Sequence, residues 1–385
     1  MLSATWHPLH PVITCDYCGR DNESSLSACR ECGTVLLSAI RKTKAEPVPE
    51  VSVDERPDLR SVQEFSFVDA AVIEGASRMI HGFRRVDWTP VARWIEARVD
   101  PLDAERAWSE ATIHWLAMLR DDLGGDYSLL TGPDAAVLCD QPWETGQWIQ
   151  EYCREAATLV REVLGEAANR AWHCGVIVVV FSDLDDYYAY VSHYCPEGEQ
   201  AASGGVFISN GVPHIAFPWT TGDQAARAIT HELAHQCVAH LPLPTWLNEG
   251  VAMLLERRLS PADGAVFGMG APLLDGEIAA RHAEFWNRER IQEFWAGTSF
   301  GIPGDSNELS YSLAEVLVNL LLQQCPAGAF PHFLRSATPE DSGQAASIDV
   351  LGRDLGDVVG TFLGPGQWRP QRKAIKACWT QVPSE

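Results

Sequence analysis

The feature that most constrains this chain is the segment His231-Glu232-Leu233-Ala234-His235. In an α-helix, residues four positions apart lie on the same face, so His231 and His235 can direct imidazole nitrogens at one metal ion. Glu232 is then placed to hold a water molecule on that metal and to accept its proton. The segment therefore predicts a helix that carries part of a catalytic zinc site.

The residues around this segment follow a helical pattern as well. Ala226, Ile229, Leu233 and Cys237 are spaced so that they form one buried apolar stripe. The two histidines fall outside the stripe, so the helix can bury its apolar side and still present them to a site. The alternative is a surface helix with two solvated histidines and no metal.

A second helix follows closely and offers a third ligand. Pro242 and Pro244 end the first helix and force a turn, and Thr245 can cap a helix over Trp246–Arg258. This helix presents Glu249 in its first turn. Three protein ligands and one open position are typical of a catalytic zinc.

His240 competes with Glu249 for the role of third ligand. In the three-histidine pattern the third histidine stands ten positions after the first, and that position is occupied here by Leu241. His240 therefore comes one residue early, and it suits the negative end of the helix dipole instead. Glu249 is the preferred ligand.

With its flanking residues, this stretch resembles the gluzincin metallopeptidases. The runs His-Glu-Leu-Ala-His-Gln and Trp-Leu-Asn-Glu-Gly-Val-Ala are similar to the aminopeptidase N-like branch and to the compact peptidase MA-like families. In those families the glutamate of the Asn-Glu-Gly segment is the third zinc ligand, which implies this role for Glu249. The resemblance, over roughly residues 116–363, implies an α+β, thermolysin-like domain. Such a domain has a small mixed sheet with an edge strand, an active-site helix and a helical C-terminal part.

The chain departs from the aminopeptidase branch in two respects. Thirteen residues separate His235 from Glu249, a short connection that is typical of the compact families. The Gly-Ala-Met-Glu-Asn exopeptidase motif is absent from the sequence. The resemblance therefore implies peptide hydrolysis, but not amino-terminal trimming.

Two cysteine pairs near the N-terminus predict a second, structural zinc. Cys15-x-x-Cys18 and Cys29-x-x-Cys32 can each supply two thiolates to a tetrahedral ion. The segment resembles short zinc-ribbon modules, and we expect the ribbon to span residues 1–40 and to dock a protein partner. The alternative is two disulfides, which is disfavoured because the first residues lack the pattern of a secretion signal.

The composition of the chain limits the classes of molecule that it is expected to bind. A net charge of −23 over 385 residues disfavours a broad nucleic-acid or anionic-membrane surface. The longest apolar run, 174–181, is too short to span a bilayer. We therefore expect a cytoplasmic enzyme that acts on peptides or proteins and does not contact a membrane. Nucleic-acid binding through the ribbon is the less favoured alternative, because Arg41, Lys42 and Lys44 form only a small basic patch.

The rest of the chain divides by pattern into four parts. A charged linker with several prolines is expected over 41–64. Apolar residues recur at helical intervals over 65–123. A catalytic subdomain over 124–260 and a helical C-terminal subdomain over 261–385 follow. Strands are predicted at 127–130, 135–139 and 175–181, and helices at 146–164, 186–191, 278–295, 308–324, 330–334 and 354–363.

A β-hairpin is predicted immediately before the histidine-bearing helix. Its strands are 204–209 and 214–217, and they are joined by a turn at Asn210-Gly211. In the resembling families the strand at this place borders the cleft, and a free strand edge can pair with an extended peptide. We therefore expect Gly205, Val206, Phe207 and His214 to form a peptide-docking rim. The alternative is an ordinary hairpin in which His214 is structural.

These observations together predict a zinc-dependent peptidase with Glu232 as general base. A further donor is needed for the oxyanion, and the resemblance implies a tyrosine or histidine from the helical C-terminal part. Tyr311 is the candidate and His282 a weaker one, and the alternative is that Tyr311 only packs. The rival hypothesis is a catalytically silent zinc protein that docks a protein or a nucleic acid through its ribbon. The presence of Glu232 argues against it, because a structural site needs no base.

Overall fold

The computed structural model describes residues 12–14, 21–23, 67–169, 175–195, 204–259, 276–326 and 328–381. The chain divides into two units. The first contains an antiparallel pair, β1 (Val12–Thr14) and β2 (Asp21–Glu23). Every other described residue lies in the second unit. The predicted linker over 41–64 lies outside the described residues. So do the four predicted ribbon ligands, Cys15, Cys18, Cys29 and Cys32.

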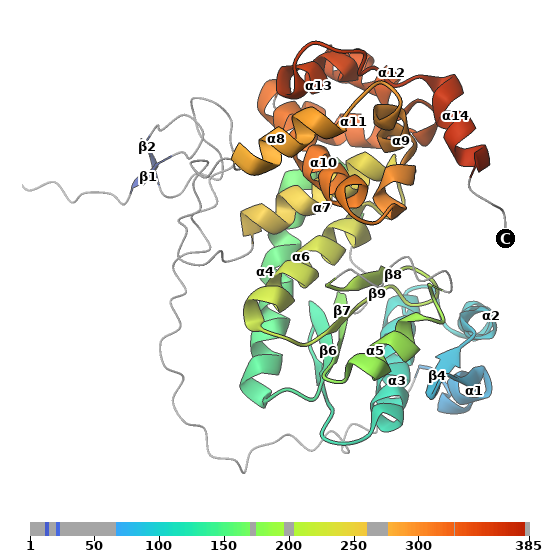
Figure 1. Ribbon diagram of the computed structural model, residues 1–385. Coiled ribbons are helices and arrows are strands. Elements are labelled where there is room, and N and C mark those ends of the chain that lie inside the picture. The colour runs from blue at the N-terminus through green and yellow to red at the C-terminus, as the bar shows by residue number, and fades with distance from the viewer. Residues whose placement is uncertain are drawn as a thin grey trace, which may run out of the picture. The chain divides into compact units, whose positions relative to one another are not determined.

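A five-stranded mixed sheet forms the centre of the second unit (Figure 1). Its strands are β5 (Ser128–Thr131), β6 (Ala135–Cys139), β7 (Val176–Phe181), β8 (Val206–Ile208) and β9 (His214–Pro218). They are ordered β5-β6-β7-β9-β8, with parallel pairing in the middle and antiparallel pairing at both ends. The sheet and the many helices confirm the α+β class, and β8 lies at a sheet edge.

Helices cover both faces of this sheet, which explains why β6 and β7 are buried at every position. α3 (Ala104–Leu123) and α5 (Leu184–Val191) pack on one face and share a core with alternate strand residues. α4 (Trp143–Leu164) contacts β6 from the other side, and α6 (Gly222–Val238) contacts β8 and β9. A short 3-10 turn, η3 (Gly165–Ala167), follows α4.

The segment before the sheet differs from the helical prediction for residues 65–123. It contains α1 (Ala70–Gly75), β3 (Ser77–Ile80), β4 (Phe83–Val86) and α2 (Trp88–Arg98). β3 and β4 form a hairpin through His81 and Gly82, and both residues have positive φ, as a two-residue hairpin turn requires. The hairpin was not predicted, because apolar residues recur at helical intervals along this segment and a His-Gly turn is a weak sequence signal.

A helical layer follows the sheet in the chain (Figure 1). It comprises α7 (Thr245–Leu259), α8 (Gly276–Phe285), α9 (Arg290–Ala296), η4 (Thr298–Gly301), α10 (Asp305–Gln324), α11 (Ala329–Ser336), η5 (Pro339–Asp341), α12 (Gln344–Ala346), η6 (Ser347–Leu351), α13 (Leu355–Leu363) and α14 (Arg372–Gln381). Within the described ranges, none of the helices combines the length and apolar character that a bilayer span requires.

The stretch 278–295, predicted to be helical, is divided between two helices, α8 and α9. The Asn287 side chain accepts hydrogen bonds from the backbone of Glu289 and Arg290, at 3.0 and 2.9 Å. An asparagine side chain that binds nearby backbone N–H groups favours a helix start over a helix interior. One helix therefore ends before Asn287 and a new helix begins after it.

α7 and α10 approach each other closely at Gly250. A Cβ atom on this glycine would lie 2.5 Å from the backbone oxygen of Ala314, so no larger residue fits without a shift. Further along, Arg257 forms an ion pair with the buried carboxylate of Glu315. These two contacts fix α10 against α7.

Candidate metal centre and its cleft

α6 carries both histidines of the predicted site. It begins at Gly222, and the Thr221 side chain caps it by accepting from the backbone N–H of Gln224 at 3.3 Å. The predicted apolar stripe is confirmed, because all four of its residues are buried: Ala226, Ile229, Leu233 and Cys237. His231 and His235 lie off the stripe and are partly exposed.

The connection between α6 and α7 is a short turn with two prolines, as predicted. The carbonyl of Pro244 accepts from the backbone of Leu247 and Asn248, both at 3.0 Å, and so begins α7. α7 then packs against α6. The turn therefore brings the first part of α7 beside the histidines.

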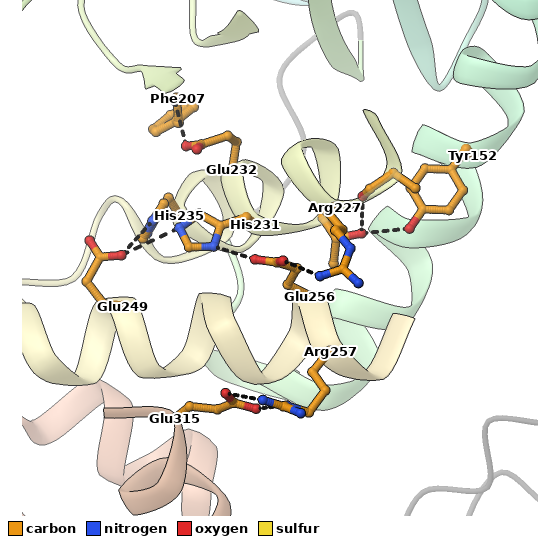
Figure 2. Close-up of polar contacts among 12 residues, drawn as sticks. Tyr152, Phe207, Arg227, His231, Glu232, His235, Glu249, Glu256, Arg257 and Glu315 are labelled. Carbon is orange, nitrogen blue, oxygen red and sulfur yellow. Dashed lines mark hydrogen bonds and ion pairs between the residues drawn. The ribbon is translucent and has the colours of Figure 1, made fainter. Parts of the chain in front are cut away.

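Three potential ligands converge between these helices (Figure 2). Nε2 of His231 and Nε2 of His235 each lie 3.5 Å from Oε2 of Glu249. A tetrahedral zinc with bonds of about 2.0–2.1 Å separates its ligand atoms by about 3.4 Å. The donor set therefore fits one zinc ion. His240 is exposed beyond the end of α6 and does not belong to this group.

The other ring nitrogens of both histidines have oxygen partners on α7. Nδ1 of His231 donates to Oε2 of Glu256 at 3.2 Å, and Nδ1 of His235 donates to Oδ1 of Asn248 at 3.1 Å. With the protons on Nδ1, the lone pairs of Nε2 face the point that both rings share with Glu249. Such partners fix the tautomer and orientation of metal-binding histidines.

Sequence reasoning missed these two supporting residues. Glu256 lies seven positions after Glu249, which places both carboxylates on one face of α7. Asn248 precedes Glu249 directly. The spacing could have signalled Glu256, but its pairing with His231 depends on how α6 and α7 pack.

Glu232 lies beside the cluster and is almost fully buried. Its Oε2 accepts the backbone N–H of Phe207, on the edge strand β8, at 2.7 Å (Figure 2). Burial raises the pKa of Glu232, and the nearby histidines His235 and His231 only partly offset the effect. A carboxylate with a raised pKa is better suited to carry a proton.

The histidine cluster attracts positive charge. Burial alone would lower the pKa of His231, but hydrogen bonds to Glu249 and Glu256 outweigh it and raise the pKa to about 10. Burial likewise opposes charge on Glu249, yet the two histidines hold its pKa far below its usual range. Carboxylates placed in this way favour a cation at the ring nitrogens, and a metal ion bound there would displace protons.

The cluster lies in a cleft of about 540 Å³. Gly205 and Phe207 line it from the β8 side, and α6 and α7 form its floor. Phe300 of η4 and Asn307 and Tyr311 of α10 line it from the helical layer. The cleft is therefore bounded by the edge strand β8 on one side and by the C-terminal helices on the other.

Tyr311, the candidate oxyanion donor, is one of the residues that line this cleft. Its ring packs edge-on against Phe300, with centroids 5.1 Å apart. Burial, and then the charges of Glu249 and Glu232, raise the pKa of Tyr311. It therefore stays protonated at neutral pH, and its hydroxyl has no hydrogen-bond partner among the described residues.

Three other predicted residues lie away from the cleft. The Val206 side chain is buried in the core under the sheet. His214 is buried on β9, where Nδ1 donates to the carbonyl of Val212 at 2.7 Å and Nε2 accepts from Tyr190 at 2.8 Å. His282 is buried beside Ser312 and Trp286. The described residues that line the cleft include none of these, so the rim reduces to Gly205 and Phe207.

No protein-family model matches this sequence, and no curated protein sequence matches it. A functional assignment therefore depends on the chemistry and geometry of the cleft.

Proposed function

We propose that this protein is a zinc-dependent peptidase of the gluzincin type, with zinc held by His231, His235 and Glu249. One observation carries the proposal: three ligand atoms converge between α6 and α7, with the buried Glu232 beside them, inside a cleft that the edge strand β8 borders. A mixed sheet with an edge strand next to the histidine-bearing helix, followed by a helical layer, supports a thermolysin-like architecture.

In this proposal the metal and the protein have separate tasks. When bound, zinc would lower the pKa of a water molecule and polarise the carbonyl of the substrate. Glu232 accepts the proton of the attacking water and delivers it to the leaving amine. Its raised pKa favours retention of the proton between these two events.

Tyr311 is the proposed donor to the developing oxyanion. It faces the same cleft from α10, stays protonated at neutral pH and has a hydroxyl available to donate. A donor aimed at developing charge in a site that excludes water stabilises the transition state strongly. Phe300 holds the ring in place.

A second zinc is proposed for the N-terminal cysteines, in a ribbon that docks a protein partner. The pairs are Cys15 with Cys18, and Cys29 with Cys32. Four thiolates close a tetrahedral site, so this zinc would be structural and without catalytic function.

Metal analysis combined with a peptide panel tests the proposal. Purified protein should contain two zinc ions per chain and hydrolyse members of a fluorogenic peptide panel. A chelator should abolish this hydrolysis, and added zinc should restore it. Zinc bound at His231, His235 and Glu249 without hydrolysis of any peptide would support the silent zinc-binding protein instead.

A further inference from the structure

A single arginine lies in the cleft beside the proposed zinc site. Arg227, His231 and His235 are spaced four residues apart on α6, so Arg227 lies one helical turn before His231. Among the described residues that line the cleft, Arg227 is the only lysine or arginine. The carboxylates there are Glu232, Glu249 and Glu256.

The guanidinium of Arg227 has donors available for a ligand. Its Nη1 lies 3.5 Å from Oε1 of Glu256, an ion pair at the outer limit of hydrogen-bond length (Figure 2). Among the described residues Arg227 has no other ion pair or hydrogen bond, and its side chain is 45% exposed. Nε and Nη2 can therefore bind a carboxylate through two parallel hydrogen bonds, which is the preferred geometry of arginine.

The edge strand gives the cleft a direction. A Cβ on Gly205 would lie 3.3 Å from Cβ of Ala228, whereas Phe207 donates to Glu232. Two strand residues span about 6.6 Å and four helix residues about 6 Å, so β8 and α6 advance together in the same direction. A path from Phe207 on β8 back to Gly205, just before this strand, therefore leads from Glu232 toward Arg227.

This direction fixes which part of a bound peptide meets Arg227. The N–H of Phe207 points away from β9 and donates to Glu232, so the outer edge of β8 faces the cleft in which a peptide would lie. Antiparallel pairing is the commoner mode, and β8 already pairs in this way with β9. An antiparallel peptide runs from the Ile208 end toward Gly205, so residues after the scissile bond approach Arg227. The distance corresponds to about two residues.

We propose that Arg227 binds a carboxylate located about two residues after the scissile bond. The substrates would be peptides that carry an acidic side chain or a free C-terminus at that place. This inference rests on the proposed peptidase function and adds the chemical class of its substrate.

The test uses the full-length, zinc-loaded protein and four matched peptides. Two peptides differ only by Glu or Gln at the second residue after the cleaved bond. The other two end at that residue with either a free carboxylate or an amide. The first pair detects recognition of a side chain and the second pair recognition of a C-terminus. In at least one pair the acidic member should have a kcat/KM about tenfold higher, chiefly through a lower KM.

Substitutions then assign the preference to Arg227. Arg227→Gln should remove the preference, and Arg227→Glu should favour a peptide with Lys at the same position. Arg154→Gln is the matched control, because Arg154 is a solvent-accessible arginine on α4 paired with Glu151. This control should keep the wild-type preference.

The outcomes separate the inference from the proposed function. Equal cleavage within both pairs overturns the inference and leaves the peptidase proposal standing. A preference for acid before the scissile bond overturns the antiparallel direction. If Arg227→Gln lowers kcat equally for acidic and neutral peptides, and Glu256→Gln does the same, Arg227 only positions Glu256 and the inference fails. No cleavage of any peptide overturns the peptidase proposal, and the inference with it.

Discussion

His231 and His214 illustrate how differently one protein can use an imidazole. The His231 side chain is 17% exposed and faces Glu249 and Glu256, and its pKa is raised to about 10. His214 is 1% exposed, and burial lowers its pKa to about 4. Its partners are a phenol and a backbone carbonyl, and neither carries charge at neutral pH.

The difference between the two environments shows that carboxylates, and not burial, distinguish a cation site from a structural histidine. Desolvation opposes the charged form at both positions. Only beside paired carboxylates does a positive charge become favourable. Four substitutions test this difference, and they are given in order of decreasing expected effect.

The largest effect is expected for Glu232→Gln, the loss of the proposed base. Hydrolysis should fall by about 10²- to 10⁴-fold, because the amide cannot accept a proton. Zinc content and thermal stability should stay close to wild type, since Glu232 is not a ligand. Steady-state kinetics together with metal analysis measures both. Retained zinc with intact hydrolysis would remove Glu232 from the mechanism.

Glu256→Gln probes the carboxylate behind His231. We expect zinc affinity to fall by about 10- to 100-fold, the usual cost of removing the partner of a ligating histidine. Competition with a chromogenic chelator measures this affinity. Glu151→Gln on the outer surface of α4 is the matched control and should leave it unchanged. If the Glu256 variant bound zinc as tightly as wild type, the carboxylate partner would not distinguish the two histidines.

His214 should make the protein less stable in mild acid. The folded protein keeps His214 neutral down to about pH 4, whereas the unfolded chain protonates it near pH 6.5. The unfolded state therefore binds more protons within this window, and stability falls as the pH decreases through it. From pH 7 to pH 5 the contribution is about 2 kcal/mol.

Urea unfolding of wild type and His214→Gln at both pH values measures this contribution. The variant should lose less stability on acidification, because it has no group to protonate at that position. An identical loss in the two proteins would contradict the assignment of the effect to His214.

The smallest effect is expected for Tyr190→Phe. It removes the hydroxyl that donates to Nε2 of His214, at a cost of about 1 to 2 kcal/mol in the free energy of unfolding. Zinc affinity should not change, because Tyr190 packs on the opposite face of the sheet from α6. An altered zinc affinity would show that the two regions are coupled through β9.

The sequence predicted those parts of the fold whose signal is local. The stripe of α6, the buried run of β7 and the turn through Pro242 and Pro244 each follow from spacing and residue type, and the structure contains all three. The β3–β4 hairpin escaped prediction because its His81-Gly82 turn lacks a strong signature.

The candidate site was predictable where its residues lie close together in the chain. Spacing predicts that His231 and His235 share one helix face with Glu232 between them, and the resemblance to the gluzincins implies that Glu249 of the next helix joins them. By contrast, spacing puts Arg227 on the helix face of His231 and His235, but its place in a cleft depends on the elements that pack around α6. His214 was predicted at the rim of the cleft but lies on β9, an inner strand of the sheet. The order of strands in a sheet does not follow from the alternation of polar and apolar residues along each strand.

Gly250 gives the architecture an unexpected vulnerability. α7 supplies Glu249, α10 supplies Tyr311, and the two helices touch where this residue has only a hydrogen atom. A single methyl group there would push the two helices apart and widen the cleft, although every polar group would still be present. Loss of turnover after such a change would result from altered packing between two helices, and not from the loss of a reacting group.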